Sequence, residues 1–165
     1  MKNTGIVRKI DELGRIVLPK ELRRSLNIAT GDDFQIILDD EKIILERYSK
    51  LKNYNDELIK ITKCFSSILN YKIYIVINNK ALGIDDEVNS GIMKIIQERK
   101  FFVNNHEERL NILMNTIDEG KSVIQPIVID SDLLGAIIIV GKDKIENIVN
   151  TSKIINNIIK SNILN

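Results

Sequence analysis

The first 48 residues pose a burial problem that limits how they can fold. They contain one phenylalanine, one tyrosine and no cysteine, so a domain of this size lacks both a large core and a disulfide to stabilise it alone. Its apolar runs nevertheless carry apolar residues on both faces of the predicted strands. In the first strand Ile6 and Ile10 lie on one face and Val7 lies on the other. In a later strand Phe34 lies on one face and Ile37 on the other. Strands covered on both faces need a partner layer, and a homodimer that shares one core supplies it.

The same segment has the pattern of a hairpin, a short helix and a second hairpin. Asp11 to Gly14 supply turn residues between two apolar runs. Pro19 ends the second run because it has no N–H to donate to a ladder, and it suits the first position of a helix. The predicted elements are strands at 6–10 and 15–18, a helix at 20–26, and strands at 34–38 and 43–47.

Positive charge is concentrated at one end of this segment. Residues up to Arg24 include seven basic and three acidic side chains, whereas Ser25 to Lys50 include three basic and six acidic ones. The formal net charge of +1 conceals this separation. A solvated charged face is the simpler interpretation. The abundance of arginine favours a nucleic-acid surface, because the planar guanidinium can form two hydrogen bonds with a phosphate or a guanine edge. A symmetric dimer would contain two copies of this basic surface.

The stretch TGIVRKIDELGRIVLPKELRRSLNIATGDDFQIILDDEKIILERY, residues 4–48, resembles the N-terminal DNA-binding domain of AbrB-type transition-state regulators. The resemblance includes the GIVRK start, the DELGR turn and the PKELRR helix start. It implies an all-β-rich swapped-hairpin homodimer that binds double-stranded promoter DNA. The family's basic DNA-contacting positions correspond to Arg8, Lys9, Arg15, Arg23 and Arg24. Lys20 is added to the predicted DNA-binding set on its charge alone.

The second half has a different pattern, typical of an α+β domain. Apolar spacing predicts helices at 56–70, 88–99 and 144–164, and strands at 72–78, 81–84, 121–130 and 133–141. Phe101–Gly120 matches no pattern, and pocket-lining loops are expected there. The predicted division is an N-terminal domain at 1–50, a polar linker at 51–55 and a C-terminal domain at 56–165.

This half resembles the GAF-like sensor domain of the stage V sporulation protein T family, AbrB relatives with a C-terminal extension. The order of helices and strands and the hairpin PIVIDSDLLGAIIIVGKD, residues 126–143, carry the resemblance. It implies either a sensor for an unidentified small-molecule ligand or a module used only for assembly. The apolar face of the closing helix either packs inside its own domain or joins two dimers into a homotetramer.

Candidate chemistry in the second half is sparse. Cys64 is the single cysteine, which excludes an internal disulfide framework and fits a reducing compartment; we expect it to be a buried or interface thiol. His106, the single histidine, is expected in a solvated loop. The acidic runs at 85–87 and 107–108 lack metal-ligand spacing. We therefore expect no catalytic residues, no metal site, no cofactor and no enzyme activity.

No apolar run has the length of a signal peptide or of a membrane span, which predicts a cytoplasmic protein with no membrane partner. The combined interpretation is a DNA-binding regulator of sporulation or transition-state genes. Two alternatives stay open. One is a ligand-sensing or scaffold protein whose N-terminal domain mainly dimerises. The other is an antitoxin with a related N-terminal fold, although a structured C-terminal domain argues against it.

Overall fold

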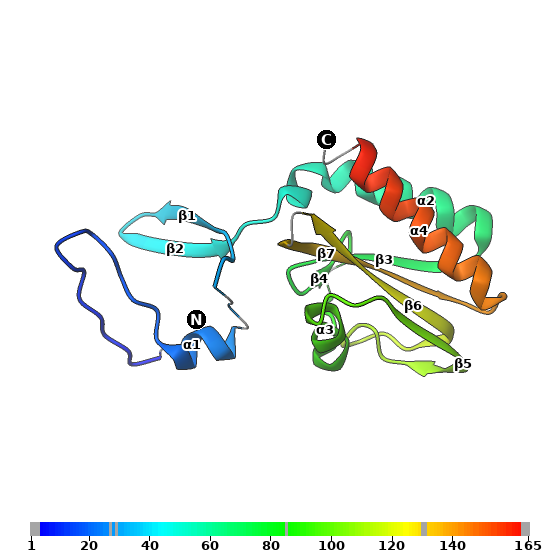
Figure 1. Ribbon diagram of the computed structural model, residues 1–165, viewed down its shortest axis with the longest axis horizontal. Helices are drawn as coiled ribbons and strands as arrows, with labels where there is room; N and C mark the ends of the chain where they lie inside the picture. The colour runs from blue at the N-terminus through cyan, green and yellow to red at the C-terminus, as the bar shows by residue number, and fades with distance from the viewer. Residues whose placement is uncertain (1–3, 27, 29, 85, 130–131, 163–165) are drawn as a thin grey trace.

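The computed structural model describes residues 4–26, 28, 30–84, 86–129 and 132–162. Figure 1 shows an N-terminal part joined by one segment to a C-terminal domain built on a sheet. The elements in chain order are α1 (Lys20–Ser25), β1 (Phe34–Asp39), β2 (Lys42–Arg47), the 3-10 helix η1 (Lys50–Tyr54), α2 (Asn55–Leu69), β3 (Lys72–Ile77), β4 (Lys80–Ala81), α3 (Ser90–Gln97), β5 (Phe102–Leu110), β6 (Asp118–Ile129), β7 (Asp132–Gly141) and α4 (Ile145–Asn162).

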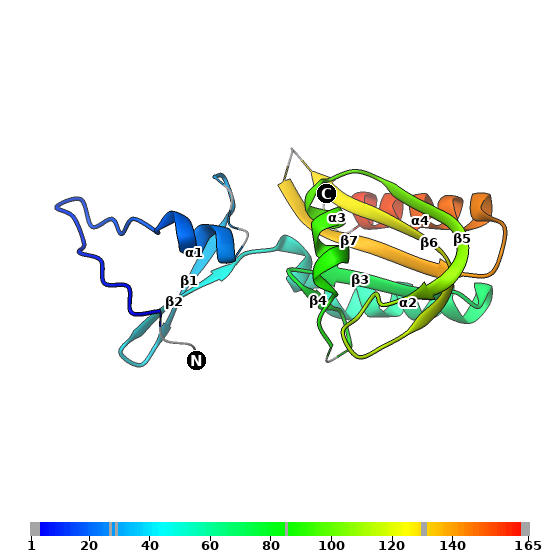
Figure 2. The same cartoon turned by 90° about the horizontal axis from the view of Figure 1, so that it is seen from below.

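The C-terminal domain is an antiparallel sheet with helices on both faces. Its strand order is β4-β3-β7-β6-β5, and every neighbouring pair is antiparallel. Helices α2 and α4 lie side by side on one face, and α3 lies on the other (Figures 1 and 2). The long hairpin of β6 and β7 forms the centre together with β3. The predicted α+β class of this half is confirmed.

Each face of the sheet has its own apolar core. Under α2 and α4 the core includes Leu58, Ile148, Ile155 and Ile159, all fully buried. These residues follow the helical spacing seen in the sequence, because positions three, four and seven apart share one helix face. The core on the other face includes Ile96 of α3. The domain therefore encloses two cores within a single chain, while part of its apolar surface stays exposed.

The segment that connects the two parts is packed against the sheet. Leu51 of η1 is fully buried in the core under α2 and α4. Ser49 is buried, and its hydroxyl donates a hydrogen bond to the carbonyl of Leu134 at 3.0 Å. Gly135 leaves room for this packing, since a Cβ there would lie 3.2 Å from Leu51 Cδ1 and 2.4 Å from the carbonyl oxygen of Val76. The predicted linker therefore contains a helical turn anchored in the C-terminal core.

The second predicted hairpin of the N-terminal part is present. Strands β1 and β2 pair in antiparallel register from Phe34 opposite Arg47 to Asp39 opposite Lys42. The chain turns at Asp40, which has a φ of 49°. This conformation is available to aspartate at modest cost, so residues 39–42 (DDEK) close the hairpin between the two predicted strands.

The first predicted hairpin is not formed in the single chain. Residues 4–18 contain a turn at 12–14 but no strand. The arms leave Val7 83% and Val17 72% exposed, and Figure 1 shows them well separated. The physical reason is the one raised by the sequence: without a covering layer, pairing these arms leaves their apolar side chains in water.

Three further expectations about the C-terminal half need correction. Phe101–Gly120 does not consist of loops, because Phe102–Leu110 forms the edge strand β5 and β6 begins at Asp118. His106 is exposed as predicted but lies on β5, not in a loop. Cys64 is exposed on α2, so the prediction of burial within the chain is wrong and an interface role stays a prediction. Among the described residues, no helix has the length and apolarity needed to cross a membrane.

We expect Leu51→Ala to lower the free energy of unfolding by about 3 kcal/mol, because it removes a fully buried leucine from the core. Asn53→Ala, at an exposed position in the same helical turn, should change it by less than about 0.5 kcal/mol. Urea unfolding followed by circular dichroism measures both. Equal effects of the two substitutions would show that η1 does not anchor the junction.

Candidate nucleic-acid interface

Three of the predicted DNA-binding residues lie on α1. The helix begins after Pro19, whose carbonyl accepts a hydrogen bond from the backbone N–H of Arg23 at 3.0 Å. Lys20 starts the helix, and Arg23 and Arg24 occupy its last turn, where positive charge interacts favourably with the helix dipole. Arg23 is half-buried, and its Nε has no hydrogen-bond partner among the described residues. The helix thus gathers three cations on one short element.

Arg15 is held by the turn that precedes it. Asp11 Oδ1 accepts the backbone N–H groups of Leu13 at 3.0 Å and of Arg15 at 2.8 Å. Asp11 Oδ2 accepts the Nε–H of the Arg15 guanidinium at 2.8 Å. The backbone N–H of Arg15, and then its guanidinium, lower the pKa of Asp11 below its ordinary value. Gly14 completes the turn with a φ of 75°, which favours glycine. The Arg15 side chain is fixed at Nε and still 69% exposed.

Arg8 and Lys9 lie on the extended segment before this turn, and both are exposed. Arg8 Nη1 donates to the neighbouring carbonyl of Val7 at 3.0 Å. Because the two arms do not pair, the structure does not place Arg8 across a hairpin from Arg15. The structure therefore brings together the cations of α1 and leaves the other three on the open segment. As DNA contacts, all six stay predictions: Arg8, Lys9, Arg15, Lys20, Arg23 and Arg24.

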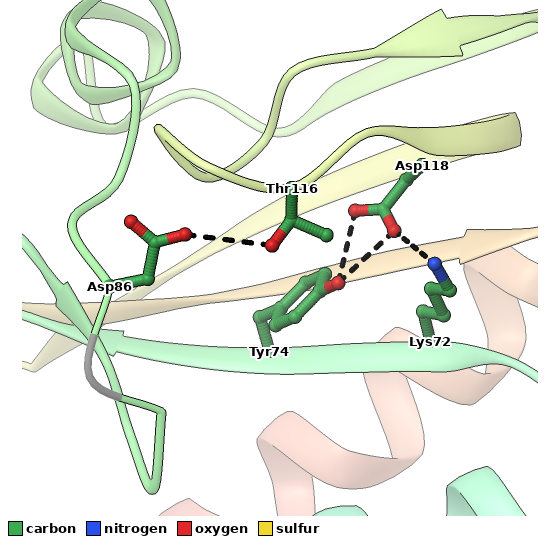
Figure 3. A network of polar contacts seen from close by, with 5 residues as sticks. All are labelled: Lys72, Tyr74, Asp86, Thr116 and Asp118. Atoms are coloured by element: carbon green, nitrogen blue, oxygen red, sulfur yellow. Dashed lines mark hydrogen bonds and ion pairs between the residues drawn. The ribbon is translucent and has the colours of Figure 1, made fainter.

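The C-terminal domain contains a buried polar cluster, shown in Figure 3. Asp118 is fully buried, and its carboxylate accepts Lys72 Nζ at 2.6 Å and the Tyr74 hydroxyl at 3.0 and 3.2 Å. Burial, and then the charge of Asp118, raise the pKa of Tyr74. Nearby, Asp86 accepts the hydroxyl of Thr116 at 3.5 Å. Both oxygens of Asp118 therefore have a donor within hydrogen-bond distance, as a buried carboxylate requires.

Sequence reasoning missed this cluster. Asp118 lies in the stretch that matched no pattern, and the two donors lie 46 and 44 residues away in the chain. Asp86 belongs to the acidic run at 85–87, which lacks metal-ligand spacing, and it accepts the backbone N–H and side-chain amide of Asn115 at 3.1 and 2.9 Å. The usable signal was the alternation in Lys72–Ile77, which places Lys72 and Tyr74 on the same face of one strand.

The described part of the chain offers few places for a metal ion or an enclosed ligand. No group of three or more His, Cys, Asp and Glu side chains there is arranged to hold a metal ion. A cavity of about 40 Å³ lies beneath the junction, lined by Ser49, Met93 and Gly135 among others, and is too small for a typical ligand. An open groove of about 620 Å³ lies between the N-terminal part and α3, with Phe34 and Lys94 in its lining.

Two family models match the chain. One is described as stage V sporulation protein T C-terminal, transcription factor, and matches residues 45–161. The other is described as antidote-toxin recognition MazE, bacterial antitoxin, and matches residues 7–53. Stage V sporulation protein T of Bacillus subtilis (strain 168) is 34% identical over 157 residues, which cover 87% of each chain. The chain belongs to the stage V sporulation protein T family. The resemblance that the sequence predicted is confirmed, and the family is one of transcription factors.

The N-terminal segment of this family member has relatives of its own. The transition state regulatory protein AbrB of Bacillus subtilis (strain 168) is 67% identical over 48 residues, 29% of this chain and 50% of AbrB. The solution structure of the N-domain of the transcription factor abrB shares 65% identity, covers 94% of that chain and 30% of this one, and has a TM-score of 0.28. The relation to AbrB therefore rests on the sequence, and it confirms the resemblance of residues 4–48.

The buried cluster gives a test within the C-terminal domain. Lys72→Met leaves a fully buried carboxylate with only a tyrosine donor, so we expect a loss of about 2–3 kcal/mol in the free energy of unfolding. Lys142→Met is the matched control, because Lys142 pairs at 3.2 Å with Glu119 and both side chains are largely exposed. Its cost should stay below about 0.5 kcal/mol. Equal losses in urea unfolding would contradict a structural role for the Asp118 cluster.

Proposed function

We propose that this chain is a DNA-binding transcription regulator that holds promoter DNA of sporulation or transition-state genes through an N-terminal homodimer. The observation that carries the proposal is the concentration of arginines on residues 8–24, beside an acidic remainder of the N-terminal part. Membership of a transcription-factor family and 67% identity to AbrB support it. The proposed contacts with phosphates and base edges are Arg8, Lys9, Arg15, Lys20, Arg23 and Arg24.

The proposed dimer is a swapped-hairpin assembly. Its support is the apolar surface that the single chain leaves uncovered: Val7, Val17 and Leu38 are 83%, 72% and 77% exposed. In this arrangement residues 6–18 pair as a hairpin against the second copy and bury these side chains. Two basic segments then lie on one face of the dimer, which raises the local positive charge that faces DNA.

The C-terminal domain in this proposal is a GAF-like module for ligand sensing or assembly. The exposed Ile68 and Ile154 on α2 and α4, 72% and 51% exposed, support a contact that joins dimers into a homotetramer. The proposed division is residues 1–50 for DNA binding, 51–55 as the connection and 56–165 for the GAF-like domain. The protein is proposed to act in the cytoplasm without catalytic activity or cofactor.

A second candidate is favoured by one observation, the match of residues 7–53 to the MazE antitoxin model. In that case the N-terminal part binds a toxin as well as DNA. The C-terminal sheet with two enclosed cores opposes it, because the residues after the N-terminal part form a folded domain that matches the sporulation family over residues 45–161. The two candidates differ in whether the chain captures a toxin protein in a pull-down.

Salt dependence tests DNA binding directly. If about 6–8 phosphates are neutralised per dimer, log K for an AT-rich promoter-length duplex should fall against log salt with a slope of roughly −5 to −7. Arg15→Ala and Arg23→Ala each remove two cations per dimer, so the slope should become shallower by about 2. Lys153→Ala, at an exposed position of α4, is the control and should leave the slope unchanged. If the wild-type chain binds the duplex weakly and neither arginine substitution changes its affinity, the result would favour the scaffold alternative.

A substitution in β1 tests the dimer. Leu38→Asp places a carboxylate among the apolar side chains proposed to meet the second copy, so sedimentation velocity should show a shift to a smaller species. Gln35→Asp introduces the same charge on the opposite face of β1 and should retain the wild-type species. Circular dichroism should show loss of strand signal only in the first variant. An unchanged sedimentation coefficient in Leu38→Asp would rule out the shared core.

A further inference from the structure

We infer that Asp11 is a positioning residue for DNA binding, acting through Arg15. The inference rests on the proposed function and adds a role for an acidic side chain within the basic segment. The ionised Asp11 carboxylate has no hydrogen-bond donor for a phosphate, and its negative charge repels the phosphate. Its contribution is to hold the guanidinium of Arg15 in one orientation before DNA arrives.

The two carboxylate oxygens of Asp11 accept hydrogen bonds from different groups. Oδ1 accepts two backbone N–H groups, those of Leu13 and Arg15, and so sets the turn. Oδ2 accepts the Nε–H of Arg15 at 2.8 Å. An amide at this position keeps an oxygen for the turn but presents N–H donors to the guanidinium. The turn and the arginine can therefore be separated experimentally.

The contact at Nε leaves the two terminal nitrogens of the guanidinium, Nη1 and Nη2, available for DNA. The described contacts of the Arg15 side chain use Nε alone, so the four N–H donors on Nη1 and Nη2 remain for a bidentate contact with a phosphate or a guanine edge. An arginine held at Nε has fewer rotamers to lose when it binds. Pre-organisation of this kind raises affinity even though the carboxylate brings a negative charge to the surface.

Glu12 provides the matched control. It is the next residue in the same turn and is exposed, so Glu12→Gln and Asp11→Asn change the net charge of the segment equally. If charge alone matters, both variants should bind the duplex more tightly, by about twofold at low salt. If Asp11 positions Arg15, Asp11→Asn should instead weaken binding by about three- to tenfold. The expected result is opposite signs for the two substitutions.

A double-mutant cycle distinguishes positioning from damage to the turn. In the Arg15→Ala background, Asp11→Asn has no guanidinium to release, so it should behave like Glu12→Gln and no longer weaken binding. In ¹⁵N NMR of the wild-type chain, the Arg15 Nε–H signal should be protected from exchange, and Asp11→Asn should lose this protection. The Leu13 amide should stay protected in both. Continued weakening in the Arg15→Ala background would overturn the inference, as would unchanged Nε–H protection.

The outcomes also separate this inference from the proposed function. If the wild-type chain binds the duplex weakly and without a steep salt slope, the proposed function fails. If the wild-type chain binds with a steep slope and Asp11→Asn tightens binding as Glu12→Gln does, only the role of Asp11 is refuted. The full-length chain is used throughout, and sedimentation velocity confirms that each variant keeps the wild-type assembly.

Discussion

The burial of apolar side chains in the first 48 residues is the constraint on which the rest of the structure depends. The C-terminal domain encloses two cores, one on each face of its sheet, whereas the N-terminal part leaves Val7, Val17 and Leu38 largely in water. Each such side chain is worth about 1.5–3 kcal/mol when it is fully buried. In the proposed dimer the same event covers these residues and pairs the arms that carry Arg8 and Arg15. Assembly and DNA affinity are then thermodynamically linked.

The connection between the two parts has a mechanical consequence. Only residues 48 and 49 separate β2 from η1, and the buried Leu51 and the Ser49 hydrogen bond to Leu134 tie this segment to β7. A Gly/Ser-rich linker behaves as a flexible coil, but this junction does not contain one. One end of the N-terminal hairpin is therefore held at the sheet, and a shift of β7 moves the end of β2 with it.

The spacing of apolar residues along the chain predicted the elements that pack one apolar face against a core. The amphipathic helices α2 and α4 and the β6–β7 hairpin follow apolar spacing, and the structure places them within a few residues of the prediction. The edge strand β5 was missed because FVNNHEERL lacks alternation: one exposed edge and polar side chains leave no period-two signal. The burial of Asp118 depends on donors more than forty residues away. Five of the six basic residues were identified through the family resemblance and Lys20 through its charge, but neither signal shows that Asp11 holds Arg15.

The distribution of charge indicates what kind of DNA binding this chain can have. Its formal net charge is +1, so the molecule as a whole is hardly attracted to a polyanion. At physiological salt the screening length is about 8 Å, and only cations close to the duplex contribute. Affinity then depends on where a few guanidinium groups lie, because there is no excess charge to compensate for a misplaced one. Under this condition a carboxylate that orients Arg15 contributes more to binding than its repulsion of phosphate removes.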